Sequence, residues 1–212
     1  MKSNILVVED DSVWRSALTQ LINHEADLQV VFAAATKEEA LAYCADHLVD
    51  VVLMDLNLTG HQLDGIQATL ELNLANYPAK VIVLTSMQEK HIILDAFTAG
   101  AIHYVNKDDF RKIPELIRSV LHQTSPQELL VKEFIRLKEA EQYNQLTPAE
   151  KEIVSLSEEG NGRTQILSTL GKSESTVKKQ VSSILRKFDA KSLKQVVSFI
   201  RNRGIREEDN TP

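Results

Sequence analysis

The sequence has little of three features that would restrict its class. It holds one cysteine, Cys44, so an internal disulfide is impossible, which suits a reducing cytoplasm. Cys44 lies in a predicted helix, where we expect it to be a small core residue. No apolar run approaches ~18 residues and no apolar signal region precedes residue 4, so we expect neither a transmembrane helix nor a leader. We also find no internal repeat.

A surplus of positive charge is missing from the chain as a whole, which carries 24 Lys and Arg against 30 Asp and Glu in 212 residues. The balance is uneven, because residues 145–205 carry 11 Lys and Arg against 6 Asp and Glu, and the rest of the chain is left with −11. The length fits one domain of ~120 residues plus a smaller one. An acidic body with a basic end indicates two tasks, and the basic end is suited to nucleic acid.

Five short apolar segments predict buried strands. Continuous runs such as Val51-Val52-Leu53-Met54 are typical of strands that are covered on both faces, as in a parallel sheet. The expected strands are residues 5–8, 28–35, 51–55, 81–85 and 102–105. Helices are expected over residues 13–22, 37–44, 66–74, 88–99 and 110–122. Thr36 and Glu39 predict a capping box for the second helix, and Gly100 closes the fourth. This alternation predicts a doubly wound α/β fold with helices on both faces of a parallel sheet.

Pro126 ends the alternation. Residues 127–142 predict a polar linker helix with Leu130, Phe134 and Leu137 on one stripe. No strand signal follows, and four helices fit residues 148–159, 163–170, 174–188 and 193–202. We therefore expect a first domain over residues 1–122, a linker over 123–145, an all-α domain over 146–205 and a disordered tail over 206–212.

Acidic residues stand where two of the buried strands end. Glu9 and Asp10 follow the first strand, and Asp55 closes the third. In a parallel sheet we expect these ends to be neighbours, at the edge where ligands bind. Three close carboxylates repel one another by about 4 kcal/mol per pair, and Mg²⁺ among their oxygens would relieve the repulsion. In the alternative interpretation, Asp10 and Asp11 cap the following helix.

Two further strand ends point to the same edge. Thr85 closes the fourth strand with a hydroxyl, and Lys107 follows the fifth with a cation. Together with Asp55 they form the set that a phosphoryl group on the aspartate would need, because cations neutralise its oxygens and a hydroxyl donates to them. An aspartyl carboxylate is a nucleophile of this type. Taken singly, Thr85 and Lys107 are ordinary surface residues.

Four pieces carry a resemblance: Val-Val-Glu9-Asp10, Leu-Met-Asp55, Leu-Thr85-Ser86 and Tyr104-Val-Asn-Lys107. With these pieces, residues 1–122 resemble the receiver domain of two-component response regulators, whose fold is a flavodoxin-like five-stranded parallel sheet. The resemblance implies that Asp55 is the phosphoacceptor. It also implies a magnesium site formed by Glu9, Asp10, Asp55 and the backbone carbonyl of Asn57.

The same resemblance implies a switch. Thr85 and Tyr104 would form the switch pair, and Lys107 would bind the phosphoryl group. The plainer interpretation of Tyr104 is a half-buried aromatic on an edge strand. One departure from the family is the loop at residues 58–64, which is longer than usual and lacks the usual proline. We expect this loop to reshape access to the site, and His61 within it to be solvated.

The helix expected over residues 174–188 has two contrasting faces. Its apolar stripe consists of Val177, Val181, Ile184, Leu185 and Phe188. The candidate DNA contacts are Thr176, Lys178, Lys179, Ser182, Arg186 and Lys187. A helix loaded in this way fits the major groove and its phosphates, whereas the alternative is a solvated basic face.

Further pieces carry a second resemblance: Leu-Thr147-Pro-Ala-Glu150, Ser173-Glu-Ser-Thr176-Val177-Lys178 and Ile184-Leu-Arg-Lys187-Phe. They resemble the LuxR-type helix-turn-helix DNA-binding domain of NarL/FixJ response regulators. The resemblance implies that residues 174–188 form the recognition helix and residues 193–202 the dimer contact. Leu167, Lys172 and Gln180 depart from the family pattern and bear on DNA affinity and target sequence more than on the fold.

The combined expectation is a cytoplasmic response regulator that acts as a transcription factor, without enzymatic activity or a membrane partner. A sensor histidine kinase would phosphorylate Asp55 in the presence of Mg²⁺, and the protein would bind DNA as a homodimer on activation. One alternative is a phosphohydrolase with Asp55 as nucleophile, although Asn57 stands where a second carboxylate is usual. The other is a phosphorylation-independent regulator or protein-interaction module with the same fold.

Overall fold

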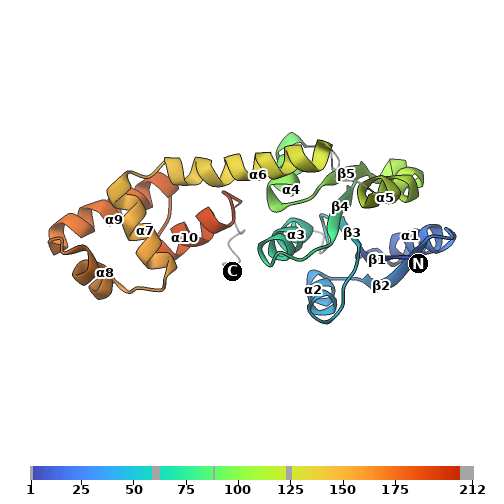
Figure 1. Ribbon diagram of the computed structural model, residues 1–212, viewed down its shortest axis with the longest axis horizontal. Coiled ribbons are helices and arrows are strands. Elements are labelled where there is room, and N and C mark those ends of the chain that lie inside the picture. The colour runs from blue at the N-terminus through green and yellow to red at the C-terminus, as the bar shows by residue number, and fades with distance from the viewer. Residues whose placement is uncertain (1, 59–62, 88, 123–125, 206–212) are drawn as a thin grey trace. The chain divides into compact units, whose positions relative to one another are not determined.

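The protein divides into two compact units. The structure is a computed structural model that describes residues 2–58, 63–87, 89–122 and 126–205 (Figure 1). The units are Met1–Ile135 and Arg136–Glu207. The division falls within helix α6 (Pro126–Asn144), so the linker helix expected from the sequence contributes residues to both units. The tail proposed for residues 206–212 lies outside the described residues.

The first unit contains the predicted parallel sheet. Its strands, within the described residues, are β1 (Ser3–Val8), β2 (Leu28–Ala34), β3 (Val51–Asp55), β4 (Lys80–Thr85) and β5 (His103–Asn106). They are ordered β2-β1-β3-β4-β5, and every neighbouring pair is parallel. Val8 pairs with Met54 and Thr85 with Asn106, so strands β1, β3, β4 and β5 end at one level. This register brings the polar residues that follow β1, β3, β4 and β5 to the same edge.

Helices cover both faces of the sheet, as the sequence predicted (Figure 1). They are α1 (Ser12–Asn23), α2 (Lys37–Asp46), α3 (Asp64–Leu74), α4 (Lys90–Ala99), the short 3₁₀ helix η1 (Lys107–Lys112) and α5 (Ile113–His122). Side chains of β1 alternate between two cores, because Ile5 and Val7 pack with α1 and α5, while Leu6 and Val8 pack with α2 and α3. Cys44 is buried in the second core, as expected.

Helix ends differ from the predictions at two places. The Thr36 hydroxyl accepts from the Glu39 N–H at 3.2 Å, but the Glu39 carboxylate accepts from the Ala35 N–H at 2.7 Å, so the expected capping box closes one residue early. The helix after the fifth strand was expected to begin at residue 110, yet α5 begins at Ile113 after the 3₁₀ turn of η1. Pro114 explains this start, because a proline without an N–H is well accommodated in the first turn of an α-helix. Gly100 closes α4 with φ 120°, as predicted.

Helix α6 is fastened to the first unit at its start. Glu128 is buried, and its carboxylate lies 2.9 Å from Lys80 Nζ on β4 and 2.9 Å from Lys132 Nζ one turn along. Lys80 Nζ also donates to the Val120 carbonyl of α5 at 2.5 Å. These ammonium groups hold the pKa of Glu128 below its usual value, against the opposing effect of burial. No helix within the described residues is long and apolar enough to cross a bilayer.

The second unit is a helical domain, as predicted. It contains α7 (Pro148–Glu158), α8 (Arg163–Leu170), α9 (Glu174–Phe188) and α10 (Leu193–Arg201) within its described residues. Its core gathers Leu146, Ile153, Val154, Ile166, Val177, Ile184, Phe188, Val196 and Ile200. Thr147 and Glu150 form the expected capping box at the start of α7. Lys172, a departure noted above, pairs with Glu152 at 3.1 Å.

Candidate functional site

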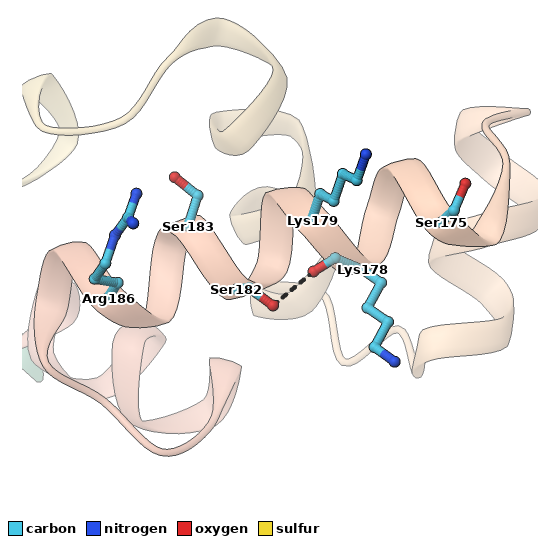
Figure 2. Close-up of a pocket in the computed structure, with 6 residues that line it drawn as sticks. All are labelled: Ser175, Lys178, Lys179, Ser182, Ser183 and Arg186. Atoms are coloured by element: carbon cyan, nitrogen blue, oxygen red, sulfur yellow. Dashed lines mark hydrogen bonds between the residues drawn. The ribbon is translucent and has the colours of Figure 1, made fainter.

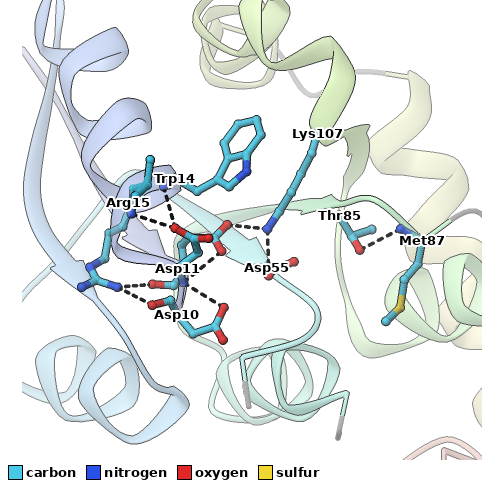
Figure 3. Close-up of polar contacts among 10 residues, drawn as sticks. Asp10, Asp11, Trp14, Arg15, Asp55, Thr85, Met87 and Lys107 are labelled. Carbon is cyan, nitrogen blue, oxygen red and sulfur yellow. Dashed lines mark hydrogen bonds and ion pairs between the residues drawn. The ribbon is translucent and has the colours of Figure 1, made fainter. Parts of the chain in front are cut away.

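Three carboxylates meet at the edge of the sheet where β1 and β3 end (Figure 3). One oxygen from each of Glu9, Asp10 and Asp55 lies within 4.8 Å of the other two. Glu9 and Asp55 are buried, and Asp10 is exposed. Asp55 is the last residue of β3, and Glu9 follows β1, so the parallel register alone brings the two side by side. The structure thus assembles the acidic cluster predicted from the sequence.

Lys107 supplies the positive charge of this cluster. Its Nζ lies 2.7 Å from Glu9 Oε2 and 3.0 Å from Asp55 Oδ2, although the three residues are far apart in the chain (Figure 3). Burial alone would lower the pKa of the Lys107 ammonium, but its contacts with Glu9 and Asp55 outweigh burial and raise that pKa. Lys107 is therefore a fixed cation directed at the proposed phosphoacceptor.

Burial has the largest influence on the pKa values of the buried carboxylates in this cluster. It raises the pKa of Asp55 above its usual value, against Lys107 and the backbone N–H groups of Leu56 and Asn57. It also raises the pKa of Glu9, with a further contribution from the charge of Asp55. Carboxylates crowded into a low-dielectric site are stabilised by any cation that their oxygens can share. This electrostatic setting suits a divalent cation or a phosphoryl group bound next to Lys107.

Residues of α1 organise the acidic loop. Asp11 caps the helix by accepting from the N–H groups of Val13 at 2.7 Å and Trp14 at 3.1 Å. Because Asp11 is the cap, the alternative in which Asp10 shares that role is not needed, and Asp10 is left to join Glu9 and Asp55. Arg15 Nη1 donates to the backbone carbonyls of Glu9 at 2.6 Å and of Asp10 at 3.0 Å. Sequence reasoning missed Arg15, since its partners are backbone atoms.

Trp14 is a second residue that the sequence analysis left out of the site. Lys107 Nζ lies 5.7 Å from the centroid of its ring, within cation–π range. The ring also packs edge-on against Phe110, with centroids 5.7 Å apart. Trp14 is the only tryptophan of the chain, so we expect its fluorescence to respond to changes at Lys107 and its carboxylate partners.

The proposed switch residues are joined through Met87. The buried Thr85 hydroxyl accepts from the Met87 N–H at 3.1 Å, and the Tyr104 hydroxyl donates to the Met87 carbonyl at 2.6 Å. Tyr104 is half-buried on edge strand β5, as its plainer interpretation expected. Thr85 and Tyr104 are therefore both hydrogen-bonded to the backbone of one residue, Met87.

The segment after β3 is held by a close backbone approach. The Gly65 N–H donates to the Leu56 carbonyl at 3.1 Å, and a Cβ added to Gly65 would lie 1.9 Å from the Asp55 carbonyl oxygen. Asn57, the proposed carbonyl ligand, is half-buried in this segment. Residues 59–62, and with them His61 and most of the loop expected to reshape access, lie outside the described residues.

Helix α9 presents the predicted basic face. Thr176, Lys178, Lys179, Ser182 and Arg186 are all exposed. An open groove of about 400 Å³ lies along the helix, lined by Ser175, Lys178, Lys179, Ser182, Ser183 and Arg186 (Figure 2). Ser173 caps the helix by accepting from the Thr176 N–H at 3.2 Å. Lys187 is exposed as well, but it differs from the other five candidate contacts because its Nζ lies 2.5 Å from Glu150 Oε2 on α7.

Comparison with known proteins agrees with both halves of this description. Residues 5–118 match the family model of the response regulator receiver domain, and residues 144–200 match that of the bacterial regulatory proteins of the luxR family. Over 203 residues the chain is 32% identical to response regulator protein VraR of Staphylococcus aureus, covering 94% of this chain and 96% of that protein.

Solved structures agree as well. A two-component response regulator of the LuxR family from Aurantimonas sp. SI85-9A1 is 29% identical, with a TM-score of 0.53, over 65% of this chain and 99% of that chain. The RcsB response regulator of Salmonella typhimurium shares the fold, at 18% identity and a TM-score of 0.53, over 94% of this chain and 99% of that chain.

A receiver-type sheet followed by a helix-turn-helix unit is the arrangement of DNA-binding two-component response regulators of the LuxR type, and the matches extend over both parts. The chain belongs to the NarL/FixJ family of these regulators, with a LuxR-type DNA-binding domain. The family resemblance found in the sequence is thereby confirmed.

Proposed function

We propose that this protein is a phosphorylation-switched transcription factor that acts in the cytoplasm. A sensor histidine kinase transfers a phosphoryl group to Asp55, and the activated protein binds paired DNA half-sites as a homodimer. One observation carries the proposal: Asp55 is 5% exposed at the tip of β3, with Lys107 Nζ 3.0 Å from its carboxylate and Glu9 and Asp10 beside it. A buried carboxylate with a fixed cation next to it is suited to form and hold an acyl phosphate.

The donor set fits Mg²⁺, which prefers a few carboxylate and carbonyl oxygens and keeps several waters. Glu9, Asp10, Asp55 and the backbone carbonyl of Asn57 would hold it. The three carboxylate oxygens are within 4.8 Å of one another, so one ion can reach all of them. When bound, the ion supplies positive charge opposite the phosphoryl oxygens.

The transfer requires little rearrangement of the protein. An Asp55 carboxylate oxygen forms a bond to phosphorus as the phosphorus–nitrogen bond to the kinase histidine breaks, and the nitrogen keeps the electron pair. Lys107 stays beside Asp55 and neutralises a phosphoryl oxygen. Thr85 then turns its hydroxyl toward the phosphoryl group and releases the Met87 N–H, and the backbone of Met87, whose carbonyl accepts from Tyr104, carries this movement to Tyr104.

For DNA binding, we propose that α9 enters the major groove. Thr176, Lys178, Lys179, Ser182 and Arg186 would contact bases and phosphates, and α10 would form the dimer contact. The exposed Lys and Arg side chains lie along the groove of α9, where a phosphate backbone can approach them (Figure 2). A dimer is expected because one small domain buries little DNA surface.

The receiver part of the proposal is tested with beryllofluoride, which mimics a phosphoryl group. MgCl₂ should change Trp14 fluorescence saturably, because Lys107 lies 5.7 Å from its ring and pairs with two of the metal ligands. Adding beryllofluoride should then increase the dimer fraction in sedimentation and the affinity for DNA. An Asp10→Asn protein is the control for the magnesium response, since Asp10 is an exposed member of the cluster. An unchanged dimer fraction and DNA affinity would favour the phosphorylation-independent regulator.

The DNA part is tested by Lys178→Ala. We expect its affinity for a duplex selected by the wild type to fall roughly 10- to 100-fold, because a good base contact is worth about 1–3 kcal/mol. Binding of the wild type should weaken steeply with salt, since each neutralised phosphate contributes about 0.9 to the logarithmic slope. Gel shifts over a salt series measure both. Lys2→Ala, an exposed lysine of the first unit, is the matched control. A Lys178→Ala protein with full sequence selectivity would remove the assignment of α9.

A phosphohydrolase is the competing enzyme function. It would use Asp55 as nucleophile and a second carboxylate two residues later as general acid. Asn57 occupies that position, and an amide does not donate a proton to a leaving group in this way. Turnover of simple phosphate esters, absent from the regulator we propose, would distinguish the two functions.

A further inference from the structure

Glu150 joins the scaffold helix α7 to the recognition helix α9. It lies in the first turn of α7, is 3% exposed, and closes the capping box by accepting from the Thr147 N–H at 2.8 Å. The same oxygen, Oε2, lies 2.5 Å from Lys187 Nζ near the end of α9. The Ser183 side chain, one turn earlier on α9, is close enough to lower the pKa of this carboxylate. One buried acid therefore holds a helix cap and the Lys187 side chain of α9 together.

The spacing of the two α9 partners gives this contact a direction. Ser183 and Lys187 are four residues apart, so they lie on one face of the helix, the face turned to α7. Ser183 also lines the groove with Lys179 and Arg186, which lie on the same row of the helix (Figure 2). The contact of Lys187 with Glu150 thus ties down the rotation of α9 about its axis, one turn from Ser183 on the groove wall.

Breaking the ion pair between Glu150 and Lys187 is unfavourable because Glu150 is buried. Burial alone would raise the pKa of Glu150, but the Lys187 ammonium and the Thr147 and Ser183 hydrogen bonds outweigh it and lower the pKa to about 2. Glu150 is therefore charged at neutral pH, and removing Lys187 leaves a buried charge without its cation. Lys187 and its neighbour Arg186 are both exposed, but the structure pairs Lys187 with Glu150 while Arg186 lines the groove.

We propose that Glu150 is a positioning residue for the DNA-reading face of α9, and that Lys187 acts through Glu150 instead of contacting DNA. This inference rests on the proposed DNA binding. It removes Lys187 from the six contacts expected from the sequence. It also assigns Ser183 a double position, on the Glu150 contact and on the wall of the groove. Without the contact, α9 stays packed through Val177, Ile184 and Phe188 but loses its fixed rotation against α7, so base contacts weaken while the number of phosphates in reach is unchanged.

Two neighbouring basic residues provide the matched test. The full-length protein is compared as wild type, Lys187→Gln and Arg186→Gln on the duplex that the wild type selects from a random pool and on a scrambled duplex of equal composition. Arg186→Gln should reduce the logarithmic salt slope by about 0.9, as expected for one lost phosphate contact. Lys187→Gln should leave the slope unchanged and lower the ratio of specific to scrambled affinity at least about 10-fold. Circular dichroism confirms that each variant is folded at the assay temperature.

Glu150→Gln separates positioning from simple electrostatics. Removing a negative charge near DNA would raise affinity if the residue had no positioning role, whereas we expect the same loss of selectivity as for Lys187→Gln. The Glu150→Gln/Lys187→Gln double variant should be no worse than either single variant, because both break one contact. Lys187→Arg keeps the ion pair and should restore selectivity, which shows that the loss in the glutamine variants is not misfolding.

The outcomes are distinct. A salt slope that falls in Lys187→Gln as in Arg186→Gln would make Lys187 a phosphate contact and overturn the inference. Full or increased selectivity of Glu150→Gln would overturn it too, while leaving the proposed DNA binding in place. If the wild type selects no duplex from the pool, with or without beryllofluoride, the proposed function fails and the positioning role fails with it.

Discussion

We expect an Asp55→Ala protein to take up no phosphoryl group from acetyl phosphate and to gain no DNA affinity from it, whereas the wild type should gain roughly 5- to 150-fold. The reason is chemical, because the nucleophile itself is removed. The variant should stay folded, since Asp55 is a buried acid whose pKa is raised by burial, and Lys107 keeps its 2.7 Å contact with Glu9. Removing Asp55 also relieves its repulsion of Glu9, whose pKa it helps to raise, and this offsets the lost contact with Lys107.

The measurement is a set of gel shifts on genomic fragments, with wild type and Asp55→Ala each tested with and without phosphodonor. Asp46→Ala is the matched control, because Asp46 is an exposed aspartate at the end of α2, outside the carboxylate cluster. We expect the control to behave as the wild type. If Asp55→Ala responded to the phosphodonor as strongly as the wild type does, the phosphoacceptor would have to be sought elsewhere.

The second large effect is expected for Gly65→Ala, which introduces a steric clash with backbone atoms and leaves the reactive side chains themselves unchanged. The added Cβ would lie 1.9 Å from the Asp55 carbonyl oxygen and 2.7 Å from Leu56 Cα, far inside contact distance. These are backbone atoms at the end of buried strand β3, so they do not yield as a flexible side chain would. Overpacking in such a place costs about 3 kcal/mol or more. Relief requires β3 and α3 to separate, which displaces Asp55 from Lys107.

Thermal unfolding and phosphoryl uptake together measure this prediction. We expect Gly65→Ala to lower both the midpoint of the first unit and the extent of labelling. Gly162→Ala serves as the comparison, because a Cβ there would meet Gln165 Oε1, the end of a flexible side chain, only at 3.8 Å. Equal midpoints for the two alanine variants would show that the close approach at Gly65 is not a constraint in solution.

Most of the acidic pocket could be predicted from the sequence. Apolar runs that end in Glu9 or Asp55 predict strands of a parallel sheet, and the topology of such a sheet brings their carboxyl ends to one edge. Lys107 was expected there for the same reason, and its 3.0 Å contact with Asp55 agrees. Arg15 and Met87 were missed, because they act through backbone atoms whose positions no residue type reveals.

The basic helix illustrates the opposite case. Lys178, Arg186 and Lys187 are equivalent in a helical pattern of charges, and all three were expected to meet DNA. The structure separates them, since Lys187 reaches Glu150, 37 residues away, while Arg186 lines the groove. A helical projection shows on which face of the helix a lysine begins, but its long side chain can reach groups to either side. The packing of α9 against α7 therefore decides the partner of Lys187.

The sequence by itself determined the order of strands and helices, the residues at the strand tips and the two-part family membership. These follow from local periodicity and from the few topologies that alternating strands and helices allow. Only the tertiary structure decided how close the tips come, that Gly65 lies against the Asp55 carbonyl, and that Glu150 holds the recognition helix. Such contacts join segments far apart in the chain, and their distances depend on how whole elements pack.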